Sequence, residues 1–141
     1  MPANPPKWFY AAAVIALVWN LMGAAAFISH ATISEEAIAA LPEAERALYE
    51  AVPLWATIAF AVAVFGGALG SLFLLLRRKL AEPVLIASFA GILIQFVHSF
   101  FIAKSMDVYG PGSIVMPVMV IVIGAALVWF AQKAGKADWL R

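Results

Sequence analysis

The chain has 141 residues, of which 65% are hydrophobic and 12% are charged, whereas an ordinary soluble domain has roughly 25% charged residues. A water-soluble protein of this length could not bury so much apolar surface, so the composition indicates one membrane domain covering residues 1–141. The net charge of +1 gives no reason to expect a nucleic-acid partner, and the absence of cysteine excludes disulfides, iron–sulfur clusters and thiol nucleophiles.

Four apolar runs are each long enough to cross the roughly 30 Å hydrocarbon core of a bilayer as a helix. They cover about residues 8–29, 53–76, 83–103 and 114–132. The first run could instead be a signal peptide, with Lys7 before it and small residues at 24–26 as a cleavage site. We favour a retained span, because the run is too long for a signal peptide and has Trp19 and Asn20 at its middle.

The loop at 30–52 is predicted to form short helices. Thr32 or Ser34 can cap the first helix, and Pro42 can open the second. The loop holds five of the eight acidic residues, and several of these suit the first turn of a helix. We therefore expect a helical lid at the outer, periplasmic interface. Its carboxylates either form a solvated surface, or attract cations or a partner.

Basic residues in the connections predict the orientation, because membranes retain them preferentially on the cytoplasmic side. Two of them, Arg46 and Lys104, fall on one side of a four-span arrangement. The other side has seven: Lys7, Arg77, Arg78, Lys79, Lys133, Lys136 and Arg141. We expect an all-α bundle of four transmembrane helices in the inner membrane. Both termini would be cytoplasmic, and the outer connections would be the helical loop and a turn at 104–113.

Polar residues inside the spans are few, and each needs a partner or a hydrated cavity. Asn20 and Gln95 lie about midway along the first and third spans and could hydrogen-bond to each other. Such a bond is worth about 0.6–2 kcal/mol and can fix helix packing without further function. His98 follows Gln95 by about one turn. The three form a candidate intramembrane polar cluster, which either packs the helices or binds a solute.

Two histidines make haem or copper binding a weaker possibility. Haem ligation would require His30 and His98 at matching depth, whereas His30 is expected at the water boundary and His98 several residues inside. Copper would require a histidine with thioether ligands such as Met106, Met116 and Met119. Methionine is more often flexible apolar filling, so we expect no cofactor.

The second span contains a row of small residues that permits close helix packing. Gly66 and Gly70 form a GxxxG pair, and Gly67 and Ser71 belong to a parallel row. These helix-packing residues can serve within one protomer or between protomers. In the fourth span, Pro117 is expected to kink the helix or to free a carbonyl group.

Catalytic constellations are missing from the sequence. The four predicted spans contain no Asp or Glu, which a proton-coupled small exporter would need. A nucleophile with a base, paired carboxylates or a metal cluster cannot be assembled either. We therefore expect no enzyme activity.

Several short segments resemble a bacterial family of small four-span membrane proteins that often carry the automatic label "sugar transporter". The resemblance covers nearly the whole chain. The segments that carry it are Trp19-Asn20-Leu21-Met22-Gly23, Leu41-Pro42-Glu43-Ala44-Glu45, Leu48-Tyr49-Glu50, Phe65-Gly66-Gly67 with Gly70, and Val108-Tyr109-Gly110-Pro111-Gly112 followed by Met116-Pro117. It implies the four-span fold and a bacterial membrane, and no functional residue is carried over from it.

Three functions remain open at the level of sequence. The leading hypothesis is a non-catalytic accessory or scaffold subunit, because the spans lack charge and carry small-residue rows. Its partners would be the lipid bilayer and either other membrane subunits or further copies of the chain. The alternative is a carrier or channel for a small solute, such as a sugar, lined by Asn20, Gln95 and His98. A haem or copper protein is the weaker alternative.

Overall fold

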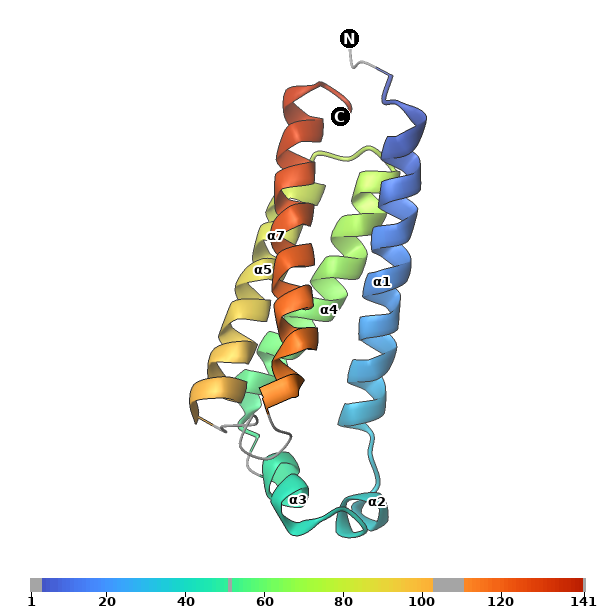
Figure 1. The fold of residues 1–141 in the computed structure, drawn as a ribbon. Helices are drawn as coiled ribbons and strands as arrows, with labels where there is room; N and C mark the ends of the chain where they lie inside the picture. The colour runs from blue at the N-terminus through green and yellow to red at the C-terminus, as the bar shows by residue number, and fades with distance from the viewer. Residues whose placement is uncertain (1–3, 51, 103–110, 141) are drawn as a thin grey trace.

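A computed structural model describes residues 4–50, 52–102 and 111–140, and this part of the chain is helical (Figure 1). Two short helices and a 3₁₀ turn accompany the long helices. Their bounds are α1 Lys7–Ala31, α2 Glu35–Ala39, α3 Glu43–Glu50, α4 Leu54–Leu75, α5 Ala81–Val97 continuing as a π-helix η1 His98–Ile102, η2 Pro111–Ile114 and α7 Val115–Lys136. Four of the described helices are long and apolar enough to span a membrane, which confirms the predicted bundle of membrane helices.

Prolines mark several of the boundaries. Pro6 and Pro53 directly precede α1 and α4, where a missing N–H leaves no helical bond unmade. The third span begins at Ala81, two residues earlier than expected, since Pro83 is tolerated in the first turn. Pro117 likewise lies in the first turn of α7, directly after η2, and the kink or freed carbonyl expected there stays a prediction.

Other boundary predictions hold to within a few residues. The fourth span continues to Lys136, one turn beyond the expected end at 132, with two lysines in the turn where cations suit the negative end of the helix dipole. Residues 103–110, which include the predicted end of the third span and most of the 104–113 turn, lie outside the described residues.

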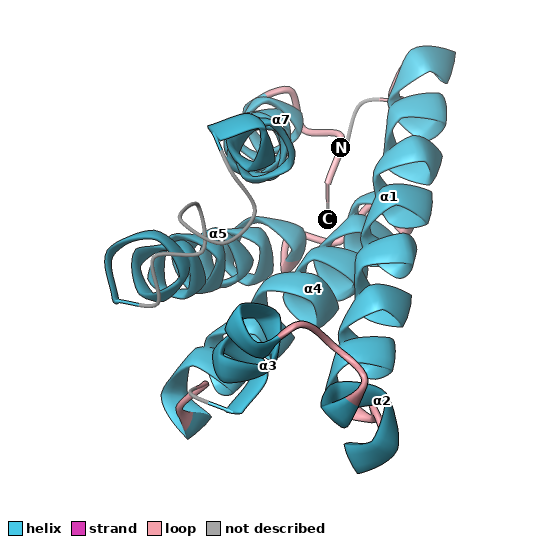
Figure 2. Cartoon of the chain, turned by 60° about the horizontal axis from the view of Figure 1, so that its bottom comes forward, coloured by secondary structure: helices cyan, strands magenta, loops and turns pink. Residues whose placement is uncertain are grey.

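The long helices follow a curved row in the order α1, α4, α5, α7. The α4–α5 pair forms the middle of the row, α1 packs on α4, and α7 packs on α5. Figure 2 shows α1 and α7 separated at the open side of the row. We call the end where α1 begins and α7 ends the termini end, and the end with α2 and α3 the loop end (Figure 1).

Small residues determine how closely α4 and α5 approach. A Cβ atom on Gly91 would lie 2.8 Å from the Ala59 carbonyl oxygen and 3.0 Å from the Ala63 nitrogen, so two backbones meet here. A Cβ atom on Gly70 would lie 2.6 Å from the Leu85 side chain, so Gly70 leaves room for that side chain. A Cβ on Gly66 would lie 3.1 Å from the Cβ of Ser88, and Gly67 is also against α5. The small-residue rows are therefore used for packing within the chain.

The termini end is closed by an apolar seal. Phe9 of α1 stacks on Phe130 of α7 with ring centroids 5.5 Å apart, and Trp139 meets Phe9 edge-on at 5.7 Å. The buried members of the seal are Phe9, Ala13, Leu74, Ala81, Leu85, Phe130, Ala131, Ala134 and Leu140. This seal connects the first and the last of the long helices.

Two matching helix ends support the seal. After α4, Arg77 has φ 60° and the Arg78 N–H donates to the Phe73 carbonyl. After α7, Asp138 has φ 61° and the Trp139 N–H donates to the Ala134 carbonyl. Both are Schellman-type ends with a residue other than glycine in the left-handed position. The Arg77 Nε also donates to the Trp139 carbonyl at 2.8 Å, which joins the two ends.

The predicted helical loop is present at the loop end. The Ser34 hydroxyl accepts a hydrogen bond from the Ala37 N–H and caps α2, whereas the Thr32 hydroxyl donates back to the Ile28 carbonyl at the end of α1. In α3, Tyr49 stacks on His30 with ring centroids 4.6 Å apart. The loop is thus fastened to the end of α1 by an aromatic contact.

Substitution of Gly91 by alanine is expected to destabilise the bundle by about 1–3 kcal/mol, because the new methyl group meets backbone atoms of α4 that cannot move aside. Gly23→Ala is the matched control, since its Cβ would meet Val64 Cγ1 at an ordinary 3.4 Å. Reversible unfolding in mixed detergent measures both variants. Equal stability of the two would contradict the proposed backbone contact.

Candidate ligand-binding cavity

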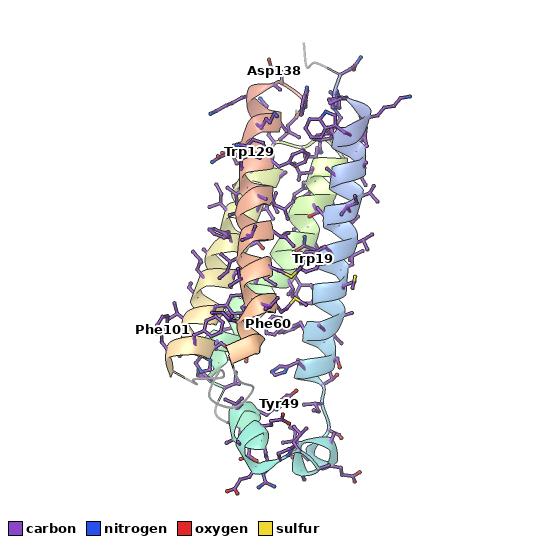
Figure 3. The ribbon with its side chains drawn as sticks, viewed as in Figure 1. Trp19, Tyr49, Phe60, Phe101, Trp129 and Asp138 are labelled. Carbon is purple, nitrogen blue, oxygen red and sulfur yellow. The ribbon has the colours of Figure 1, made fainter. Side chains whose placement is uncertain are left out.

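A cavity of about 420 Å³ lies among the four long helices, and we call it the main cavity. Figure 3 labels two of its lining residues, Trp19 about halfway along α1 and Phe60 nearer the loop end. Its walls are Trp19, Asn20, Met22, Gly23 and Ala26 of α1, Phe60, Ala63 and Val64 of α4, Leu85, Ser88, Ile92, Gln95 and Phe96 of α5, and Met116, Val120, Ile123, Gly124 and Leu127 of α7. Most of this lining is apolar, with a few polar groups on the walls.

The shape of the row explains where the cavity lies. Because α1 packs on α4 and α7 on α5, the space between α1 and α7 is bounded by these two helices at the sides and by the α4–α5 pair behind (Figure 2). The seal closes this space at the termini end, where Trp8 and Phe130 bring α1 and α7 together with ring centroids 5.8 Å apart. The main cavity is thus closed toward that end.

Asn20 is held by its neighbours on α1 and α4. Its amide nitrogen donates to the Ala16 carbonyl at 2.8 Å and to the Ser71 hydroxyl at 3.2 Å. Its amide oxygen lies against Gly67, where a Cβ atom would collide with it. Within the described part of the chain, no hydrogen bond joins Asn20 to Gln95, so the expected bond across the bundle is not formed. The two amides instead line the same cavity.

Ser88 is also satisfied internally. Its hydroxyl donates to the Ala63 carbonyl at 2.6 Å, across the α4–α5 contact. Gln95 differs, because its half-buried side chain makes no hydrogen bond to the described residues. Gln95 therefore keeps both ends of its amide available for a guest, whereas the Asn20 nitrogen and the Ser88 hydroxyl hydrogen are used within the protein.

A second, smaller cavity of about 190 Å³ lies at the loop end, and we call it the loop-end chamber. Its walls are Phe27, His30, Leu48, Tyr49, Val52, Ala56, Thr57, Phe60, Gln95, His98 and Ser99. Two of these residues, Phe60 and Gln95, also line the main cavity, so the two spaces adjoin. The helical loop contributes Leu48 and Tyr49, which means that α3 covers this chamber.

Both histidines line the loop-end chamber, where His30 is half-buried and His98 is buried. His98 is 6% exposed, and its ring meets the ring of Trp55 edge-on at 5.3 Å. It begins the π-helix η1, a local widening that is frequent at functional sites. The predicted cluster of three is therefore split: Gln95 borders both spaces, Asn20 the main cavity and His98 the chamber.

The haem and copper hypotheses gain no support from this geometry. Among the described residues, no three His, Cys, Asp or Glu side chains gather as a metal site. Met116 lines the main cavity and Met119 is exposed, while Met106 lies outside the described residues. The histidines thus share a chamber without a third metal ligand of those types.

The sequence reasoning missed the Ser71 contact and the cavity itself. Ser71 was predicted only as a helix-packing residue, yet it is fully buried and accepts the Asn20 bond. Its place in the row with Gly67, on the face that meets other helices, is the signal that could have found it. No protein-family model, curated protein or solved structure matches this chain, so the resemblance to the small four-span family stays a prediction.

A double-mutant cycle with Asn20→Ala and Ser71→Ala is expected to give a coupling free energy of about 0.6–1.7 kcal/mol, the range for hydrogen bonds between membrane helices. Unfolding in mixed detergent measures the two single variants and the double variant. Asn20→Ala combined with Gln95→Ala is the control pair, with an expected coupling free energy near zero. A larger coupling in the control pair would show that Asn20 bonds to Gln95 instead.

Proposed function

We propose that this protein binds a small, largely apolar molecule in the main cavity, at the level of the membrane, without catalysing a reaction. The observation that carries the proposal is the cavity itself, with apolar walls from all four long helices and few polar groups. Ligand sites of small molecules have volumes of about 300–1,000 Å³ and this same composition. The hypothesis of solute handling is therefore better supported than it is by sequence alone.

The chemistry of the walls favours an apolar guest over a sugar. A sugar needs many hydrogen-bonding partners, whereas Asn20 and Ser88 already bond within the protein. The volume of about 420 Å³ corresponds to roughly 17 non-hydrogen atoms, by scaling from the six carbons of benzene in a cavity of about 150 Å³. A hydrocarbon chain or ring system of that size is the guest that we propose.

The seal supports binding or carriage rather than an open channel, because it blocks the termini end with packed aromatic rings. The accessory-subunit hypothesis, with other membrane subunits or further copies as partners, stays a prediction. One of its motivations is weaker than expected, since Gly66, Gly67 and Gly70 of the small-residue rows are packed inside the chain. The site described above is what favours ligand binding.

We further propose a bacterial inner membrane as the location, with the termini end in the cytoplasm and the loop end in the periplasm. The excess of basic residues at the connections supports this orientation. In the structure, the α4–α5 turn with Arg77 and Arg78 lies at the same end as the start of α1 and the end of α7 (Figure 1). Basic connections thus gather at one end of the bundle.

Filling the main cavity is expected to abolish binding of an apolar probe. In the native protein, 1-bromododecane should quench the fluorescence of Trp19, because Trp19 lines the cavity. The Trp19 contribution is the difference in tryptophan fluorescence between the native protein and the Trp19→Phe variant. Val120→Phe should weaken this quenching at least about 10-fold, since it takes up the space of several carbon atoms.

Val122→Phe is the matched control, because Val122 lies on the same helix, is 60% exposed and does not line the cavity. It should bind the probe as tightly as the native protein does. Equal affinity of the Val120 variant, or loss of binding in both variants, would count against the main cavity as the binding site.

The orientation can be tested with single cysteines, because the chain contains none. Glu43→Cys, in the exposed first turn of α3, should react with a membrane-impermeant maleimide in cells whose outer membrane is permeable to it. Asn4→Cys, exposed before α1, should react only after the inner membrane is broken. The reverse labelling pattern would invert the proposed topology.

A further inference from the structure

The main cavity and the loop-end chamber together have the layout of an amphipathic site. They adjoin at Phe60 and Gln95, which line both. One side of this junction is apolar and receives walls from all four long helices. On the other side His30, His98, Tyr49 and Ser99 supply polar atoms to a much smaller space. A guest that occupied both would place its body and its head in different chemical surroundings.

The surroundings of the His98 side chain point to a ligand in the chamber. Its side chain is 6% exposed and lines the chamber, and the described part of the chain gives it no hydrogen-bond partner. The contact that the structure gives its ring is the edge-on one with Trp55. Among the described residues no fully buried side-chain nitrogen or oxygen lacks a hydrogen-bond partner, so the ring nitrogens of His98 are not completely enclosed. They can therefore donate a hydrogen bond to a polar group in the chamber, or accept one from it.

Charge decides what kind of head fits. The described lining of the chamber contains no Lys, Arg, Asp or Glu, so neither an anionic nor a cationic head would find a counter-charge there. The loop that covers the chamber is rich in glutamate, with Glu43, Glu45 and Glu50 in α3, which further disfavours an anion. An imidazole and an amide can each donate or accept, which suits a hydroxyl or a carbonyl group.

We propose that the guest is an amphipathic molecule dissolved in the membrane, with an uncharged hydroxyl or carbonyl head. The head lies in the loop-end chamber and hydrogen-bonds to His98 and Gln95, and the hydrocarbon tail lies in the main cavity. The molecule enters between α1 and α7, where the row of helices is open. This inference rests on the proposed function and names the class of molecule that the site takes.

The test uses three probes, each with a twelve-carbon chain and a bromine atom at one end. Two of them carry a polar head at the other end, and the third has none. These are 12-bromododecan-1-ol, 12-bromododecanoate and 1-bromododecane, each added to the full-length protein in bilayers of unbrominated lipid. The alcohol should bind about 2- to 10-fold more tightly than the hydrocarbon, as expected for one added hydrogen bond, and more tightly than the carboxylate. Its bromine should quench Trp19 in the main cavity and spare Trp55 beside His98.

Two variants assign this preference to the chamber. His98→Phe keeps a ring against Trp55, and Gln95→Leu keeps a similar volume, so both should retain the helical circular-dichroism spectrum. Each should reduce the advantage of the alcohol over the hydrocarbon. His98→Phe should also leave hydrocarbon binding unchanged, because His98 does not line the main cavity. Gln132→Leu is the matched control, because Gln132 is exposed on α7 and lines neither cavity. It should preserve the advantage.

The possible failures are distinguishable. Equal binding of alcohol and hydrocarbon, tighter binding of the carboxylate, quenching of Trp55 instead of Trp19, or an advantage that survives both variants would each overturn the inference. In those cases, quenching of Trp19 by 1-bromododecane would leave the proposed function standing. Failure of 1-bromododecane to bind at all would overturn both.

Discussion

The close approach of α4 and α5 is the constraint on which the rest of the structure depends. Lipid tails are as apolar as leucine, so membrane helices associate through tight contact rather than through exclusion of water. At Gly91 the backbones of the two helices meet, and Gly70 and Gly66 continue the contact toward the turn that joins them. The pair then serves as a base on which the other two helices are placed.

Each outer helix is positioned by a different kind of contact with this base. On α1, the Asn20 amide donates a hydrogen bond to Ser71 and lies against Gly67. The hydrogen bond and the space left by the glycine, which has no side chain, together hold α1 on α4. On α7, Gly124 allows Phe89 and Ile92 of α5 to come close, since a Cβ there would lie 3.0 Å from either side chain. The outer helices are thus fixed to opposite sides of the pair, and the cavity lies between them.

The membrane fold could be predicted from the sequence because its signals are local. Length and apolarity identify the four spans, and Ser34 and Pro42 mark the helices of the loop. The boundary that differs is the one at Pro83, which was expected to begin the third span and instead lies in the first turn of α5. A proline pattern alone does not distinguish a first turn from a helix interior.

The candidate site was less predictable, because it depends on which helices become neighbours. The sequence identified Asn20, Gln95 and His98 as unusual residues but did not show that α1 lies beside α4. Because of that neighbour, Asn20 forms its hydrogen bond with Ser71 and not with Gln95. The pairing of both histidines in one chamber likewise depends on α3 folding back over the bundle. The spacing of polar and apolar residues along one helix does not specify which other helices will pack against it.

The seal at the termini end has a consequence for the order of assembly. Phe9 and Phe130 are far apart in sequence, whereas α4 and α5 are joined by a short turn, so loop-closure entropy delays the seal relative to the central pair. Three helices can therefore be packed while the wall that α7 provides is still absent. During that interval lipid chains have access to the space from the side that α7 later covers, and the last helix to arrive adds a wall beside whatever occupies it.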